Sequence, residues 1–476
     1  MQWLLSWLAT EIATLFGAKV NEVNYVLCLL LAFPLGVLYR WIHYPTLRIL
    51  FSLVTGGWLG LTALGIHSLH IVVASFVCYL IMLTNCKRQH HYVFFWAFLY
   101  LSVGHIYRQW TDYLGWSLDF TLPLMIVTQK VISLSYALHD GMMNSEWKTE
   151  QKGTSIRTLP NILEFYAFIL FPPSLLVGPY LEFVDWQAHL QNRRCIKDAA
   201  RLGFGRLVQG LGCLTIYLIG DKWLPIQLLG DERFLSMGHW LVRFLWIDVI
   251  LFGYRFKYYF AWKLAEGALA SSGMGRLSEQ EPRRFEAIQV IDILGFELAE
   301  NPRELTSSWN KTTNVWLRRY VYERYNERYN SYSICLFNGR RMVRPWNLYY
   351  AFVISAFWHG FYPGYYLFFV TMSVVTSIHR KIRKRLRPLV TPHHTVAVCW
   401  RIASILLTRF TCSYFIISFT ALSFEASFKV YRSLHLTGHA ILLIAMIIFY
   451  TGTFDRLVAK YHFGIADSYG ASNKID

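Results

Sequence analysis

Residues 46–86 decide the fold class, and they read TLRILFSLVTGGWLGLTALGIHSLHIVVASFVCYLIMLTNC. Arg48 is the one member of the Asp, Glu, Lys and Arg group among them. The apolar residues form continuous runs and do not alternate with polar ones, which favours helices over half-exposed strands. A membrane crossing needs about 20 mostly apolar residues. This stretch therefore predicts two membrane-spanning helices, over residues 46–65 and 68–86.

The rest of the chain has the same character. Of its 476 residues, 55% are hydrophobic and 16% are charged, whereas a soluble domain carries roughly 25% charged residues. A disordered protein is also excluded, because it would be poor in apolar residues. Lipid offers no hydrogen-bond partners, so spanning elements must be helices or a closed barrel, and continuous apolar runs favour helices. We expect an all-α polytopic membrane helix bundle of about 10–12 transmembrane helices, forming a single domain over residues 1–476.

The expected spans share a length close to one membrane crossing. They are residues 23–40, 46–65, 68–86, 92–108, 119–138, 161–181, 202–220, 240–268, 347–378 (one span or two), 401–424 and 433–453. We expect residues 3–17 to form a helix at the membrane interface, 270–346 a polar cytosolic insert, and 456–476 a C-terminal tail.

Charge and cysteine content restrict the partners. The formal net charge is +17, and in membrane proteins such an excess collects in cytoplasmic loops. Nucleic acid is the rival partner of a basic protein, but here the basic residues lie between apolar spans, so we expect none. The eight cysteines include no CxxC pair, so neither a disulfide framework nor a metal site is predicted. Ionisable residues inside expected spans, such as Lys130, Asp248, Lys263 and Glu266, are expected to face a cavity or a partner.

The polar insert contains a helix with a clear beginning. Asn301 is a good N-cap, Pro302 suits the first helical position, and Glu304 stands where a capping-box acid belongs. We expect one helix to run from here to Tyr322.

Within that expected helix, Trp309, Trp316 and Tyr320 would form an aromatic stripe, with Asn310 and Asn314 on a neighbouring face. Such a stripe more often serves packing than it lines a substrate passage.

The candidate base is His359, in a mostly apolar stretch. Most lone histidines of this kind are hydrogen-bonded core residues. If Gly360 ends the helix and Pro363 prevents its continuation, however, His359 lies in the last turn, where the helix dipole would stabilise an imidazolium. Its unperturbed pKa is near neutrality, as a general base requires. Ser355 lies one turn earlier, but with no nearby acid and no nucleophile elbow a Ser–His pair is disfavoured.

Together these segments resemble the membrane-bound O-acyltransferase (MBOAT) family, in its lysophospholipid acyltransferase branch. The similar stretches follow one another over about residues 20–455, and they are Gln129–Gly141, Val177–Pro179 with Phe183, Arg255–Gly267, Trp309-Asn310 with Thr313 and Trp316-Leu317, and Ser355–Tyr366. One departure is that residues 326–345 look like an added cytosolic loop.

The resemblance implies phospholipid remodelling, in which an acyl chain passes from acyl-CoA to the free hydroxyl of a lysophospholipid. Acyl-CoA is then a co-substrate, no further cofactor is expected, and the location is the endoplasmic reticulum membrane. The resemblance implies His359 as general base and Asn310 as the residue that orients a reactant or donates to the thioester oxygen. From their positions, Trp309, Trp358 and Tyr365 are candidate substrate contacts.

Two alternatives stay open at this point. The acceptor of the acyl chain could be a protein or a sterol, or the charged groups could serve a non-enzymatic transporter. A transporter often shows two related halves, and no internal repeat is visible here. The sequence does not give the head group, the acyl chain, the 1-acyl or 2-acyl type of acceptor, or the oligomeric state.

Overall fold

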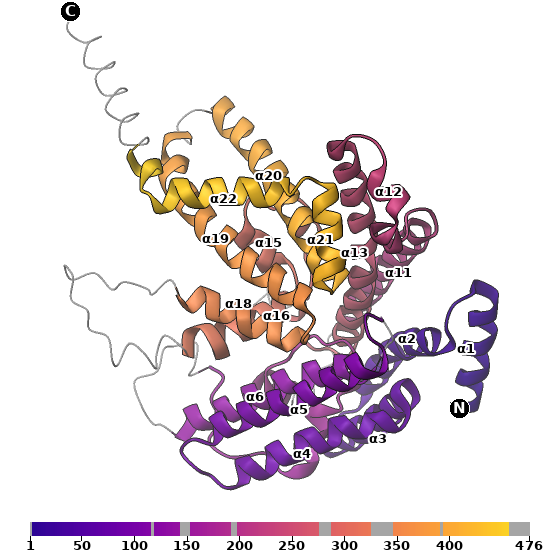
Figure 1. Ribbon diagram of the computed structural model, residues 1–476. Coiled ribbons are helices and arrows are strands. Elements are labelled where there is room, and N and C mark those ends of the chain that lie inside the picture. The colour runs from indigo at the N-terminus through magenta and orange to yellow at the C-terminus, as the bar shows by residue number, and fades with distance from the viewer. Residues whose placement is uncertain are drawn as a thin grey trace, which may run out of the picture. The chain divides into compact units, whose positions relative to one another are not determined.

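The computed structural model describes residues 2–115, 119–142, 153–191, 198–275, 287–324, 346–390 and 394–456. Within these ranges the regular elements are all helical, which confirms the all-α prediction (Figure 1). The chain divides into two compact units. The first comprises Met1–Pro225, Phe252–Ile293 and Ser307–Phe361, and the second comprises Ile226–Leu251, Leu294–Thr306 and Tyr362–Asp476.

The first unit is organised around one buried helix, α6. The elements of its N-terminal part are α1 (Gln2–Phe16), α2 (Val20–Trp41), α3 (Pro45–Leu64), the short turn η1 (Gly65–Ser68), α4 (Leu69–Leu83), α5 (Gln89–Thr111) and α6 (Thr121–Met142). Nearly every residue of α6 is buried, because α4 and α5 pack on it together with later elements of the same unit. α6 can therefore hold other elements in place on several sides.

The expected span over residues 161–181 is wrong. The structure has two short helices there, α8 (Ile162–Ile169) and α9 (Pro172–Leu175). Asn161 caps the first helix, since its Oδ1 accepts the backbone N–H groups of Leu163 and Glu164. The chain turns at Phe171 because the two prolines that follow supply no backbone N–H to continue α8. Most apolar residues from Phe165 onward in this segment are buried within the protein, whereas Leu163 at the start of α8 is exposed.

The remaining elements of the first unit carry the candidate site. They are α10 (Phe183–Gln191), α11 (Ala199–Trp223), the part of α13 (Trp240–Ser271) from Phe252 onward, α16 (Lys311–Leu317), the π-helical turn η4 (Arg318–Tyr322) that continues α16, and α18 (Trp346–His359). α18 packs against η4. The expected loop 326–345 lies outside the described residues, as does the expected tail apart from Arg456.

The second unit contains most of the C-terminal helices. Its elements include η2 (Ile226–Gly230), α12 (Glu232–Ser236), most of α14 (Ile293–Glu297) and α15 (Pro302–Ser308), α19 (Pro363–Val390), α20 (His394–Ala421), α21 (Phe424–Ser433) and α22 (Thr437–Tyr450). α19 and α20 pack together. Gly364 permits their close approach, because a Cβ there would collide with the carbonyl oxygen of Ser418. The expected segment 347–378 is thus two helices, α18 and α19.

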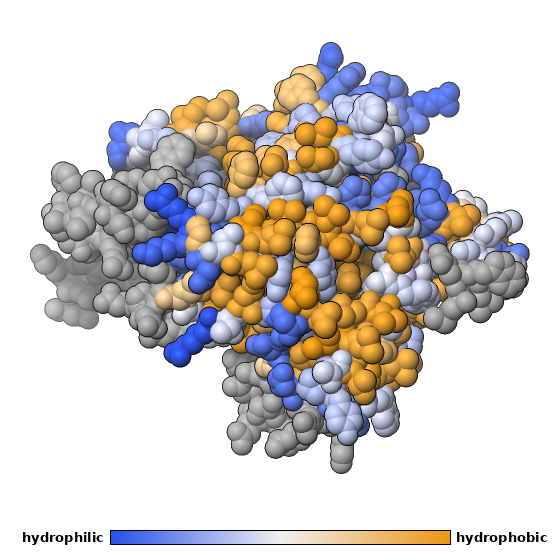
Figure 2. Space-filling view, turned by 90° about the horizontal axis from the view of Figure 1, so that it is seen from below, coloured by the Kyte–Doolittle hydropathy of each residue, from blue (hydrophilic) through white to orange (hydrophobic). Residues whose placement is uncertain are grey.

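Several helices are built to meet lipid. The sequence predicts about 10–12 transmembrane helices, and five candidate spans among the described residues are long and apolar enough to cross a membrane, namely Val20–Trp41, Pro45–Leu83, Thr121–Met142, Ala199–Trp223 and Thr395–Ala421. If the bent pair α21 and α22 is counted as one span, the number rises to six. More large apolar side chains are exposed than is usual for a water-soluble protein, and Figure 2 shows many of them on one face. On α22, for example, Leu443 and Ile444 are more than half exposed. The protein is a multi-pass membrane protein.

Candidate active site

His359 is the last residue of α18, as the sequence predicts. Gly360 follows with φ +125°, a backbone conformation that side-chain-bearing residues rarely adopt, and its N–H donates to the carbonyl oxygens of Ala356 and Phe357. Pro363 then begins α19. The negative end of the α18 dipole therefore lies at His359.

The ring of His359 is oriented by its own helix. Nδ1 lies 2.7 Å from the carbonyl oxygen of Ser355. A carbonyl oxygen only accepts hydrogen bonds, so Nδ1 carries the hydrogen and Nε2 carries the lone pair of the neutral imidazole. This fixes the tautomer that a general base needs, with Nε2 as the accepting atom. Ser355 contributes its backbone carbonyl to this contact, not its hydroxyl.

A second histidine holds the turn that follows. His105, on α5, donates from Nε2 to the carbonyl oxygen of Trp358 over 3.1 Å. Its ring also lies against Gly360, where an added Cβ would be 3.3 Å from the ring atoms. Sequence reasoning missed His105, because it is one histidine inside an expected apolar span and nothing local links it to residues about 250 positions later.

Asn310 does not lie inside a continuous helix, so the prediction of one helix up to Tyr322 is wrong. α15 ends at Ser308, α16 begins at Lys311, and Asn310 between them has φ 40° and ψ 58°, in the left-handed region. Asparagine tolerates this region better than most residues. The expected start of the first helix is confirmed, since Oδ1 of Asn301 accepts the N–H of Glu304 over 3.0 Å.

Three hydrogen bonds to α6 bring the His359 and Asn310 segments together. The indole N–H of Trp358 donates to the carbonyl oxygen of Met125 over 3.1 Å. The indole N–H of Trp316 donates to the carbonyl oxygen of Gln129 over 3.2 Å, and the Gln129 side chain donates to the hydroxyl of Thr313 over 3.1 Å. Met125 and Gln129 are four residues apart on one helix face, a rise of about 6 Å. The residue before His359 and the helix after Asn310 are therefore fixed one turn apart on α6.

The predicted substrate contacts lie in different surroundings. Trp309 packs against Trp262, Tyr258 and Tyr259 of α13, with ring centroids 4.9, 5.8 and 5.9 Å away. Trp358 is buried. Trp309 lies between α15 and α16, so the predicted stripe of three aromatic residues does not form. Of the three, Trp316 and Tyr320 lie on α16 and η4, after Asn310.

Tyr365 belongs to the second unit, where it packs against Tyr362 and Phe419. Contacts of Trp309, Trp358 and Tyr365 with substrate stay predictions. Among the described residues, no group of three or more His, Cys, Asp or Glu side chains could hold a metal ion.

The ionisable groups flagged within apolar stretches have partners. Lys130 is fully buried and donates to the carbonyl oxygens of Phe168 and Ile169. Lys263 pairs with Glu266 over 2.8 Å. In the second unit, Asp248 pairs with Arg409 over 2.9 Å. The expectation that such groups face a partner or a cavity is confirmed for these four.

Comparison with known proteins agrees with these features. The chain matches the model of "MBOAT, membrane-bound O-acyltransferase family" over residues 50–420. It is 30% identical over 468 residues to lysophospholipid acyltransferase 6 of Drosophila melanogaster, covering 92% of this chain and 62% of the fly protein. It is 28% identical to the lysophospholipid acyltransferase of Schizosaccharomyces pombe, covering 92% and 88% of the two chains, and 29% identical to membrane-bound glycerophospholipid O-acyltransferase 2 of Gallus gallus, covering 90% and 85%. With its helical membrane architecture and most of its length matched, the chain belongs to the membrane-bound O-acyltransferase family.

Proposed function

We propose that the protein transfers an acyl chain from acyl-CoA to the free hydroxyl of a lysophospholipid. The observation that carries this proposal is the contact between Nδ1 of His359 and the Ser355 carbonyl, which leaves Nε2 as the proton acceptor. The names of the fly, fission yeast and chicken relatives support the acceptor class, since each refers to a lysophospholipid or glycerophospholipid acyltransferase.

The reaction needs one base and one hydrogen-bond donor. A thioester is already activated, so the acceptor hydroxyl can attack its carbonyl carbon directly. His359 Nε2 takes the hydroxyl proton as the new C–O bond forms. The C–S bond then breaks, and the same proton passes from the imidazolium to the departing CoA thiolate. The helix dipole at the end of α18 favours the transient imidazolium.

Asn310 is the proposed donor to the oxyanion. Its carboxamide N–H group would stabilise the negative charge that develops on the thioester oxygen, and removal of such a donor costs about 10²–10³-fold in rate. The hydrogen bonds to Met125 and Gln129 support this pairing of roles, because they fix the segments of His359 and Asn310 on one face of α6. We propose the endoplasmic reticulum membrane as the location, where acyl-CoA and lysophospholipid meet.

The test is an acyl-transfer assay on membranes from cells depleted of endogenous activity. Labelled oleoyl- and arachidonoyl-CoA are offered with lysophospholipids that differ in head group and in the position of the acyl chain. We expect diacyl phospholipid from the wild type and a loss of at least about 100-fold in His359→Ala and Asn310→Ala.

The chain provides matched controls. Asn85 is exposed and has φ 51°, so Asn85→Ala removes an asparagine from the same kind of backbone conformation away from the site. His43→Ala removes an exposed histidine. Both should retain the wild-type rate. If no lysophospholipid is acylated, protein and sterol acceptors are tested next; if His359→Ala remains fully active, the proposed mechanism is wrong.

A further inference from the structure

The backbone turn that carries Asn310 is enclosed by a segment from an earlier part of the chain. The carbonyl oxygen of Val290 accepts the N–H of Lys311 over 2.7 Å, and the N–H of Asp292 donates to the carbonyl oxygen of Ser308 over 3.0 Å. These two bonds flank Trp309 and Asn310 on either side. A left-handed conformation costs a non-glycine residue of order 1–3 kcal/mol and persists only where its surroundings hold it. Residues 290–292 stabilise the left-handed conformation of Asn310 through these two hydrogen bonds.

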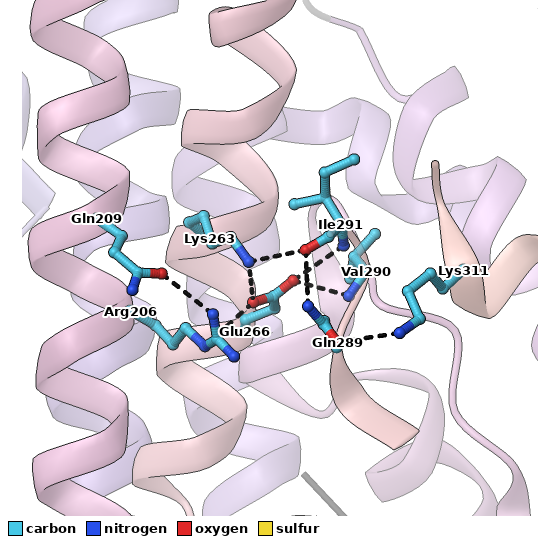
Figure 3. Close-up of polar contacts among 8 residues, drawn as sticks. All are labelled: Arg206, Gln209, Lys263, Glu266, Gln289, Val290, Ile291 and Lys311. Atoms are coloured by element: carbon cyan, nitrogen blue, oxygen red, sulfur yellow. Dashed lines mark hydrogen bonds and ion pairs between the residues drawn. The ribbon is translucent and has the colours of Figure 1, made fainter. Parts of the chain in front are cut away.

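One buried carboxylate fastens this segment to α13. Oε1 of Glu266 accepts the N–H of Val290 over 2.8 Å and that of Ile291 over 3.0 Å (Figure 3). Oε2 accepts the ammonium of Lys263 over 2.8 Å, and the same ammonium donates to the carbonyl oxygen of Ile291 over 2.9 Å. Glu266 and Lys263 are 1% and 2% exposed. Glu266 therefore binds two backbone N–H groups of the segment, and Lys263 binds one of its carbonyl oxygens.

The charge of Glu266 is balanced on two sides. Besides Lys263, the guanidinium of Arg206 on α11 lies 3.4 Å from Oε2. Lys311 adds a further bond to the segment, from its ammonium to Oε1 of Gln289 over 3.0 Å (Figure 3). A continuous series of bonds thus runs from α13 through residues 289–292 to the residue after Asn310.

We propose that Glu266, held by Lys263, is a positioning residue that keeps the Asn310 carboxamide in its working orientation. The proposal rests on the proposed function, because it assigns a task to Asn310 in acyl transfer. It goes beyond the balancing of a buried charge: both Oε1 contacts end on the segment that encloses Asn310. Loss of the carboxylate should therefore change the rate of the bound complex more than the binding of substrates.

The central variant is Glu266→Ala, assayed with varied acyl-CoA and varied lysophospholipid. We expect the saturating rate to fall about 10- to 100-fold, since a displacement of about 1 Å can cost 10²-fold, while both KM values stay within about twofold. The double variant Glu266→Gln with Lys263→Met keeps an oxygen that can accept from Val290 and Ile291 but has no charge. It should recover most of the lost rate. Asp248→Ala, which breaks a carboxylate–arginine pair elsewhere on α13, is the control for general destabilisation.

A double-mutant cycle separates positioning from structure. If Glu266 acts through Asn310, then Glu266→Ala causes no further loss when it is added to Asn310→Ala. Hydrogen exchange of the Val290, Ile291 and Lys311 amides gives a readout independent of activity, and protection should fall in Glu266→Ala and return in the Gln–Met pair.

Three results would overturn the proposal. The first is a double variant whose rate loss is the product of the losses in Glu266→Ala and Asn310→Ala, the second is a Glu266→Gln, Lys263→Met variant as slow as Glu266→Ala, and the third is unchanged amide protection in Glu266→Ala. A wild type that makes no product defeats the proposed function instead, and the exchange experiment still decides whether Glu266 holds the Asn310 turn.

Discussion

Gly360→Ala is the substitution that most directly tests how His359 is held. Gly360 has φ +125°, which a residue with a side chain adopts only under strain, and its new Cβ would lie 3.3 Å from the His105 ring. His105 itself is hydrogen-bonded to the Trp358 carbonyl. The added methyl group therefore strains the backbone of Gly360 and also crowds the His105 ring, which is hydrogen-bonded to the turn.

The size of the effect follows from these two contacts. Strain of this kind costs of order 1–3 kcal/mol, and 1.4 kcal/mol corresponds to a factor of ten. If the turn keeps its shape, the strain lowers the free energy of unfolding by that amount. If the turn relaxes, His359 at the end of α18 moves with it, and about 1 Å of movement can cost 10²-fold in rate. We expect the rate to fall about 10- to 100-fold and the melting temperature to fall by a few degrees.

The assay compares Gly360→Ala with a matched glycine that has space around it. Gly57 lies within α3, and an added Cβ there meets no atom within 4 Å. Gly57→Ala should leave the rate unchanged and should not lower stability, because alanine favours a helix by up to about 1 kcal/mol over glycine. Wild-type rate and melting temperature in Gly360→Ala would show that the turn does not position His359.

Three further substitutions test other supports of the fold and the site. His105→Phe keeps a ring but removes the donor to the Trp358 carbonyl, so we expect a several-fold lower rate with little change in expression, and an unchanged rate would contradict this role. Glu182→Ala removes the carboxylate that lies 2.8 Å from the Arg319 guanidinium. Removing one partner of a buried ion pair costs up to roughly 3–5 kcal/mol of stability, and the cost is lower here because Arg319 is partly exposed. The melting temperature should therefore drop by several degrees in Glu182→Ala and by less in Glu182→Gln. Gly364→Ala should prevent the close packing of α19 and α20, which size-exclusion chromatography of the solubilised protein would detect as aggregation, and a monodisperse, fully active variant would refute it.

The features that the sequence predicted correctly are those with local causes. The end of α18 at His359 depends on Gly360 and Pro363, one and four positions later, and the helix start at Asn301 depends on a side chain that bonds within its own turn. The break at Asn310 has a different origin. It depends on backbone bonds to residues 290–292, about 20 positions earlier, which no helix signal in the 301–322 stretch contains. Helical periodicity therefore placed Trp309 in a stripe that does not form.

The burial of α6 explains why the arrangement of the site could not be predicted. An amphipathic helix reveals its inner face through the spacing of its apolar residues, but α6 is buried on nearly all sides and gives no such signal. Two of its contacts use the carbonyl oxygens of Met125 and Gln129, which every residue type possesses, and a third uses the side chain of Gln129. Lys130 also makes its contacts through its side chain. Its ammonium donates to the last carbonyl groups of α8, where the negative end of the helix dipole stabilises the positive charge as a carboxylate would. Lys130, an ionisable residue inside an expected apolar span, is thus a sign in the sequence that α6 binds its neighbours, and it identifies the helix but not the partners.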